Sequence, residues 1–243
     1  MYRSAALFSP LVLALSAAGH DPVVHRAPAQ TGRIAGTVEI SASLTSRRPQ
    51  FRIYENTRTA SIAPRVPENE LTAELRNVVL YLRADQGTEL QARDDSAAIA
   101  VMSQIGERFD PHVLPVQLGT RVDFPNYDEI YHNVFSLSRA RTFDLGRYPK
   151  GASKAVTFTK PGVVQVFCHI HADMSGIVMV LANPLFTVPD AKGAYALENV
   201  PPGEYTIVGW HERTKPVSHR VRVVAGRTTT VHFKLPLGTT PGS

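Results

Sequence analysis

The stretch that decides the fold is "GVVQVFCHIHADMSGIVMV", residues 162–180. Apolar residues alternate through its first part, which predicts a strand, and an apolar run resumes near its end, which predicts a second strand. The residues between, 169–175, are then a short, hairpin-like connection. Cys168 therefore ends the first strand, and His171 and Met174 lie in the loop that this strand enters.

Cys168 is the only cysteine among 243 residues. The N-terminal sequence "MYRSAALFSPLVLALSAAGH" predicts a cleaved signal peptide over residues 1–18, with a basic start, an apolar middle and small residues at its end. We therefore expect an exported protein, periplasmic or secreted. In such a compartment a lone cysteine indicates either a disulfide to another molecule or a thiol with a special role, with a buried inert thiol as the plain alternative.

The composition predicts an ordinary globular protein and excludes some partners. Hydrophobic residues make up 43% and charged residues 19%, and the absence of long helical periods together with 16 glycines and 18 prolines favours an all-β fold. The formal charge of +5 is spread thinly, and no basic run interleaves with aromatics as in a nucleic-acid groove. We therefore expect no nucleic-acid partner. No segment after the leader has the length of a membrane span, so we also expect no membrane span.

The residues around Cys168 form a compact set of metal donors. A thiolate, an imidazole and a thioether occur within seven residues, and "YHNVFS" offers His132 from another expected strand. Two histidines, one cysteine and a distant methionine are the ligand set of a blue copper site. Zinc is the competitor, but it prefers four cysteine or histidine ligands, or three and a water, and methionine is a poor zinc ligand.

Residues 96–182 resemble a cupredoxin domain of the plastocyanin, pseudoazurin and amicyanin group. The stretches that carry the resemblance are "GTRVDFPNYDEIYHNVFSLS" and "KPGVVQVFCHIHADMSGIVMV", and the ligand loop has the short, amicyanin-like spacing. The resemblance implies a Greek-key β-sandwich with one mononuclear type 1 copper. It also implies that Asn133 ties the two ligand loops together by hydrogen bonds, and that the metal ligands are His132, Cys168, His171 and Met174.

A second domain is indicated on either side of this one. The stretch "DAKGAYALENVPPGEYTIVGWHE" resembles a carboxypeptidase regulatory-like β-sandwich, which is similar to transthyretin. That family opens with G-x-I-x-G-x-V and then an "NVVLYL"-like strand, and here both lie far upstream. We therefore expect one sandwich made of residues 31–90 and 183–236, with the cupredoxin inserted and a disordered tail at 237–243. Two tandem domains are the alternative.

Chains of this arrangement resemble bacterial plastocyanin-like or methylamine-utilisation proteins. The leading hypothesis is an exported one-electron carrier, not an enzyme, whose partner is a redox protein such as a c-type cytochrome or a dehydrogenase. An envelope or cell-surface binding module, in which copper is structural or sensory, is the alternative. Copper enzymes pair a type 1 site with further histidine-bound copper, and the sequence shows no second histidine cluster.

The remaining histidines are scattered, so we expect them to be exposed or bonded within the fold rather than to bind metal. His169 lies between the ligands but on the opposite side of the expected strand from Cys168. Met179 and Trp210 are expected in the core. The other scattered histidines are His112, His211, His219 and His232.

Overall fold

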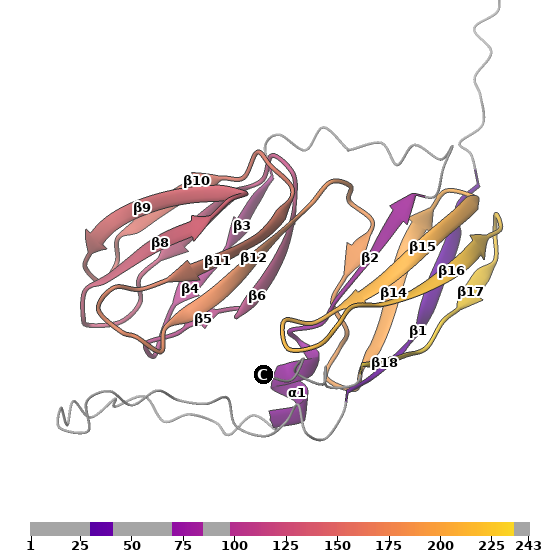
Figure 1. The fold of residues 1–243 in the computed structure, drawn as a ribbon, viewed down its shortest axis with the longest axis horizontal. Helices are drawn as coiled ribbons and strands as arrows, with labels where there is room; N and C mark the ends of the chain where they lie inside the picture. The colour runs from indigo at the N-terminus through magenta and orange to yellow at the C-terminus, as the bar shows by residue number, and fades with distance from the viewer. Residues whose placement is uncertain (1–29, 41–69, 85–97, 236–243) are drawn as a thin grey trace, which may run out of the picture.

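The computed structural model describes residues 30–40, 70–84 and 98–235. The expected leader (1–18) and tail (237–243), and much of the expected segment 31–90, lie outside these residues. The described chain forms two β-sandwiches side by side, and α1 (Glu70–Leu75) is the one helix within it (Figure 1). The predicted all-β class is confirmed. In the described ranges, no helix combines the length and apolar character that crossing a bilayer requires.

The central sandwich is built from β3 to β12 and is drawn in magenta to orange in Figure 1. One sheet has five strands, in the order β6 (Val113–Gln117), β12 (Ser175–Leu181), β11 (Gly162–Phe167), β8 (His132–Ser138) and β9 (Arg141–Tyr148). The facing sheet has three, in the order β10 (Ser153–Thr157), β7 (Arg121–Pro125) and β3 (Ile99–Val101). A small hairpin pairs β4 (Ser103–Gln104) with β5 (Phe109–Asp110).

Alternation along β11 and β12 places the ligand loop. In β11 the side chains of Val164 and Val166 are fully buried, and Cys168 continues the same face one residue past the end of the strand. The two strands pair antiparallel, ending with Phe167 opposite Ser175. The predicted strand, loop and strand are therefore confirmed, and the loop emerges at one end of the sandwich.

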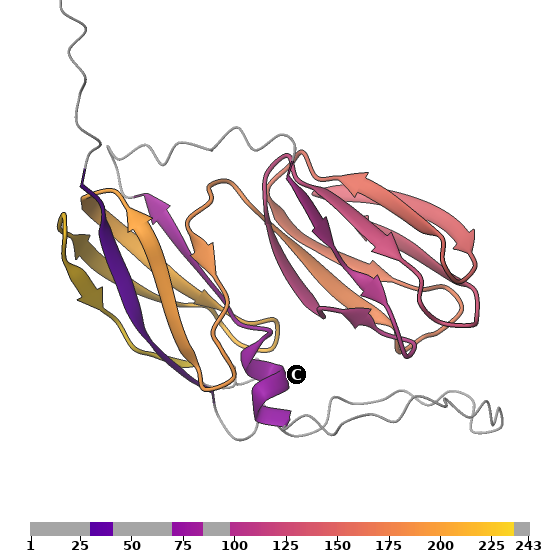
Figure 2. The ribbon, with the colours of Figure 1, turned by 180° about the vertical axis from the view of Figure 1, so that it is seen from behind.

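The flanking sandwich contains strands from both ends of the chain. One of its sheets joins β14 (Ala194–Val200), β1 (Gly32–Ile40), β17 (Thr228–Thr230) and β18 (Phe233–Leu235). The other has the order β13 (Phe186–Thr187), β2 (Val79–Ala84), β15 (Gly203–Trp210) and β16 (Val217–Val223). Figure 2 shows the indigo β1 flanked by these later strands. Both sheets thus mix early and late strands around a single apolar core.

Gly36 lies where β1 changes partner from β17 to β18. The neighbouring Ala35 pairs with Thr230, while Val38 pairs with Phe233. A Cβ at Gly36 would lie 1.6 Å from the carbonyl oxygen of Val231. Only glycine lets the two backbones approach this closely, so this position helps the C-terminal strands to join the N-terminal one.

The two sandwiches pack against each other through β12. Its Val178 and Val180 point into the central core, whereas alternate residues point out of it. Those outward residues enter an apolar cluster with the outer face of β2 and with Trp210. Met179 is therefore buried, and Trp210 partly buried, between the sandwiches rather than inside one of them. The interface cluster consists of Val79, Tyr81, Val113, Ile177, Met179, Leu181, Phe186 and Trp210.

Candidate metal centre

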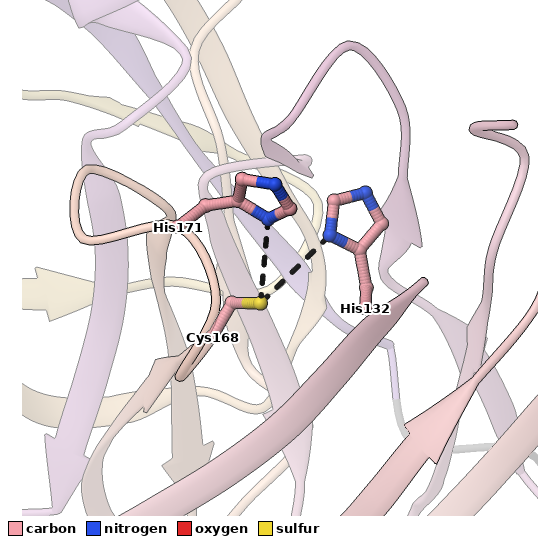
Figure 3. A group of neighbouring side chains, drawn as sticks. All are labelled: His132, Cys168 and His171. Carbon is pink, nitrogen blue, oxygen red and sulfur yellow. Dashed lines mark hydrogen bonds between the residues drawn. The ribbon is translucent and has the colours of Figure 1, made fainter. Parts of the chain in front are cut away.

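Three side chains from separate points of the chain converge at one end of the central sandwich. His132 is the first residue of β8, Cys168 directly follows β11, and His171 lies in the loop before β12. The sulfur of Cys168 lies 3.8 Å from Nδ1 of His132 and 3.7 Å from Nδ1 of His171. Figure 3 shows one nitrogen of each imidazole ring pointing at this sulfur.

The spacing of these donors fits one metal ion. The three ligand atoms all lie within 4.8 Å of one another. Bonds of roughly 2 Å from one shared ion to two nitrogens and a sulfur require donor separations of this size. The two rings meet edge to face, with centroids 4.7 Å apart, so each presents one nitrogen to the shared point. Two imidazoles and a thiolate are the equatorial donors of a blue copper site, and the residues present fit that metal.

The group of metal donors is buried except at one edge. His132 is fully buried, and Cys168 and Met174 are 5% and 1% exposed. Cys168 and Met174 belong to the apolar core of the central sandwich. His171 is only half-buried. Water is therefore kept from the sulfur, while one imidazole reaches toward the surface.

The surroundings of Cys168 favour the ionised form of its thiol. Burial alone raises its pKa, but a hydrogen bond from His132 and backbone N–H groups of Asn133 and Ile170 outweigh burial. Together with His171 they lower the pKa of Cys168 to about 6. The thiolate, which is the form that binds metals, is therefore the main form at neutral pH.

Asp128 holds the ring of His132 and was not recognised in the sequence. Its Oδ2 lies 2.8 Å from Nε2 of His132, which leaves Nδ1 of the ring to face the sulfur. The backbone N–H groups of Gly106 and Glu107 donate to the same carboxylate at 2.6 and 2.8 Å. Such a carboxylate fixes the tautomer and orientation of a ligand histidine.

The hydrogen bonds around Asp128 and His132 also shift the pKa values of both side chains. Burial alone would raise the pKa of Asp128, but the backbone donors and His132 outweigh burial, and the pKa is lowered. Burial alone would lower the pKa of His132, but hydrogen bonds with Cys168 and Asp128 raise it. The only clue in the sequence was a carboxylate four residues before the histidine, in a stretch without periodic structure.

Asn133 bridges β8 and the ligand loop. Its Oδ1 accepts a hydrogen bond from the backbone N–H of His169 at 2.7 Å, and its Nδ2 lies 3.4 Å from Oδ1 of Asp144. This is the link that the resemblance implied. His169 itself points away from the cluster, because its ring stacks on Phe135 with centroids 3.7 Å apart.

Met174 is held beside the cluster by main-chain bonds. Its carbonyl accepts from the N–H of Cys168 at 3.1 Å, and its own N–H donates to the carbonyl of His171 at 3.0 Å. These bonds close the loop on itself and place the buried methionine next to the cysteine in the fold. Its role as the fourth ligand stays a prediction.

The scattered histidines lie elsewhere. His211 is fully buried and bonds Glu74 at 3.0 Å, and His112 bonds Glu212 at 2.9 Å. Within the ranges that the structure describes, His132, Cys168 and His171 form the one such group of three potential metal donors.

No protein-family model and no curated protein matches the sequence. Similar solved structures include a Cu-containing nitrite reductase from Thermus scotoductus SA-01, 26% identical over 41% of this chain, with a TM-score of 0.33. This chain covers 25% of that enzyme. A purple cupredoxin from Nitrosopumilus maritimus is 22% identical, with coverage of 35% and 99% of the two chains and a TM-score of 0.31.

A reduced Cu(I) form of an amicyanin variant is 20% identical, with coverage of 42% of this chain and 98% of that chain and a TM-score of 0.33. Each of these similarities covers less than half of this chain. At these TM-scores the similarities carry no argument, and the argument for a function rests on the geometry of the site itself.

Proposed function

We propose that the protein is an exported one-electron carrier with a single type 1 copper site. The observation that carries the proposal is the position of one buried sulfur, 3.8 and 3.7 Å from the nitrogens of two histidines. A copper ion bound there supplies one-electron chemistry by alternating between Cu(II) and Cu(I).

The chain's own residues supply a rigid, dry ligand set. His132, Cys168 and His171 are the strong donors, and Met174 is the weak fourth donor. Asp128 and Asn133 hold the ligands in place through the hydrogen bonds described above. Because four protein donors leave no position for a substrate, the proposal is a carrier rather than an enzyme.

Electrons pass through the exposed edge of His171 in this proposal. Apolar side chains next to the ligands in sequence are also exposed: Ile170 by 40%, Tyr131 by 58% and Ile130 by 39%. Exposed apolar side chains close to the ligands in sequence suit brief docking of another redox protein, such as a c-type cytochrome or a dehydrogenase. A periplasmic or secreted location follows from the leader expected in the sequence.

The experiment is a visible and EPR spectrum of the mature protein refilled with Cu(II). We expect intense colour from the thiolate-to-copper transition and the EPR signal of a type 1 site. Cys168→Ala removes the thiolate and should abolish the colour while circular dichroism still reports a folded β protein. A colourless, folded wild type that holds Cu(II) would contradict the proposal, and tight binding of Zn(II) alone would favour a zinc site.

A further inference from the structure

The ligand loop leads into β12, a strand of the central sandwich whose outer face packs against the flanking sandwich. β12 begins at Ser175, directly after Met174. The outward side chains of Ile177, Met179 and Leu181 are 4%, 5% and 8% exposed, and they lie in the apolar cluster between the sandwiches. The strand that follows the loop is therefore held from the flanking side as well as from its own core.

His112 connects the start of this strand to the flanking sandwich. Its Nδ1 lies 3.1 Å from the carbonyl oxygen of Ser175, and its Nε2 lies 2.9 Å from Oε1 of Glu212. A carbonyl oxygen can only accept, so Nδ1–H donates to Ser175, and Nε2 shares the second hydrogen bond with the carboxyl group of Glu212. Glu212 belongs to the turn between β15 and β16, a hundred residues away along the chain.

The backbone around this contact leaves little room for movement. The N–H of Ile177 donates to the carbonyl of His112 at 2.8 Å. A Cβ on Gly176 would lie 3.0 Å from Cβ of Phe109 and 3.2 Å from the carbonyl oxygen of His112. The side chains of His112 and Glu212 are about four-fifths buried, so their hydrogen bond is partly shielded from water.

These contacts make a continuous path from Glu212 to the ligand loop. We infer that Glu212 and His112 are positioning residues for the metal site, through which the flanking sandwich fixes the C-terminal end of the loop. Glu212 orients the imidazole of His112, the imidazole holds the Ser175 carbonyl, and Ser175 sets the place of Met174 relative to the sulfur. The flanking sandwich is then part of the scaffold that sets the properties of the metal. This inference rests on the proposed copper site for its spectroscopic consequence but not for its structural one.

The test compares Glu212→Ala with Glu212→Gln in the full chain. In the metal-free protein we expect the backbone amides of residues 168–175 to exchange with deuterium about tenfold faster in Glu212→Ala, because a charge-assisted hydrogen bond is lost. Glu212→Gln keeps an accepting oxygen and should restore most of the protection. In the copper form, Glu212→Ala should shift the reduction potential and the visible spectrum, and Glu212→Gln should shift them less.

The matched control is Glu204→Ala, which removes an exposed carboxylate from β15 of the same sandwich, where it pairs with Arg222 at 3.5 Å. It should change neither loop exchange nor potential. Unchanged protection of residues 168–175 in Glu212→Ala would overturn the inference, and so would faster exchange without any change in spectrum or potential. A wild type without the type 1 spectrum would instead refute the proposed function, while the exchange result would still decide whether the flanking sandwich holds the loop.

Discussion

Each sandwich buries a histidine, and the two histidines differ in the partner of one ring nitrogen, Nδ1. His132 in the central sandwich and His211 in the flanking one are both fully buried. Each presents Nε2 to a carboxylate, Asp128 at 2.8 Å and Glu74 at 3.0 Å. Nδ1 of His132 faces the sulfur of Cys168, whereas Nδ1 of His211 accepts the backbone N–H of Arg213 at 3.2 Å.

The comparison teaches that burial and a carboxylate partner do not make a metal site. Both ring nitrogens of His211 are used in hydrogen bonds within the fold, and Glu74 also accepts from Arg213 at 3.2 Å and from Asn77 at 3.2 Å. That network ties α1 to the turn after β15 and is structural. Around His132, Asp128 accepts a hydrogen bond from Nε2, so Nδ1 is the nitrogen whose electron pair can bind a metal in place of its hydrogen bond to Cys168.

The largest expected difference comes from removing each imidazole in turn. His132→Ala should abolish the type 1 spectrum, because a strong donor is lost. His211→Ala should leave that spectrum unchanged but lower the free energy of unfolding by about 3 kcal/mol, because it removes a buried hydrogen bond to the Glu74 carboxylate and leaves that group without its partner. Copper spectra and urea unfolding of both variants measure this. Loss of the type 1 spectrum in both variants would contradict the assignment of His132 as a ligand and His211 as a structural residue.

The next effect concerns the thiol of Cys168, which His132 faces and His211 does not. In the metal-free protein, a lowered pKa means that the thiolate of Cys168 persists down to about pH 6 and is lost below it. The rate of alkylation should therefore rise through pH 6 and level off above it. Relative to an ordinary thiol of pKa 9.0, the acidity is about a thousandfold higher.

The control for this titration is the same protein unfolded in urea, whose thiol should titrate near the ordinary value. A folded protein whose alkylation rate rises only above pH 8 would show that the hydrogen bonds to the sulfur do not outweigh its burial.

Replacing the carboxylate partners of the two histidines, Asp128 and Glu74, should change copper affinity by different and smaller factors. Asp128→Asn should weaken copper binding about ten- to a hundredfold, because the ring of His132 loses the group that fixes its tautomer. Glu74→Gln should leave copper affinity unchanged and reduce stability only. Competition with a chelator of known affinity measures the first, and thermal unfolding the second. Equal copper affinities for the two variants would remove Asp128 from the site.

The smallest effect is expected at the fourth donor. Met174→Gln should keep the colour, because the thiolate remains, and should lower the reduction potential, because an amide oxygen favours Cu(II) over Cu(I) more than a thioether does. A redox titration followed in the visible measures the shift. Met179→Leu, at a buried position between the sandwiches, is the control and should not change the potential. A potential unchanged by Met174→Gln would argue against axial ligation.

Most of the ligand loop was predictable because it is local. Alternation in β11, the apolar run of β12 and the spacing of Cys168, His171 and Met174 all lie within one stretch. His132 was proposed because it lies in another expected strand, and the family resemblance agreed; nothing local joins it to Cys168, which lies 36 positions later. The helix α1 was missed, since its six residues are too few to show a period.

The partners of the buried polar groups were not predictable. His211 and Glu74 are 137 residues apart, and His112 and Glu212 are a hundred apart. Each looked like an isolated residue because a pair across the chain leaves no spacing pattern in the sequence. Whether the two outer segments form one sandwich was open for the same reason, and the pairing of β1 with β14 and β17 is visible only in the fold.

The amino-acid sequence by itself determined the strands and the chemical kinds of donor, because alternation and side-chain chemistry are properties of neighbouring residues. Only the tertiary structure decided which histidine keeps a nitrogen for a metal, how the lone thiol is ionised, and what holds the end of the ligand loop. Hydrogen bonds and burial depend on which distant segments the fold brings together, and those segments leave no trace of one another in the local sequence.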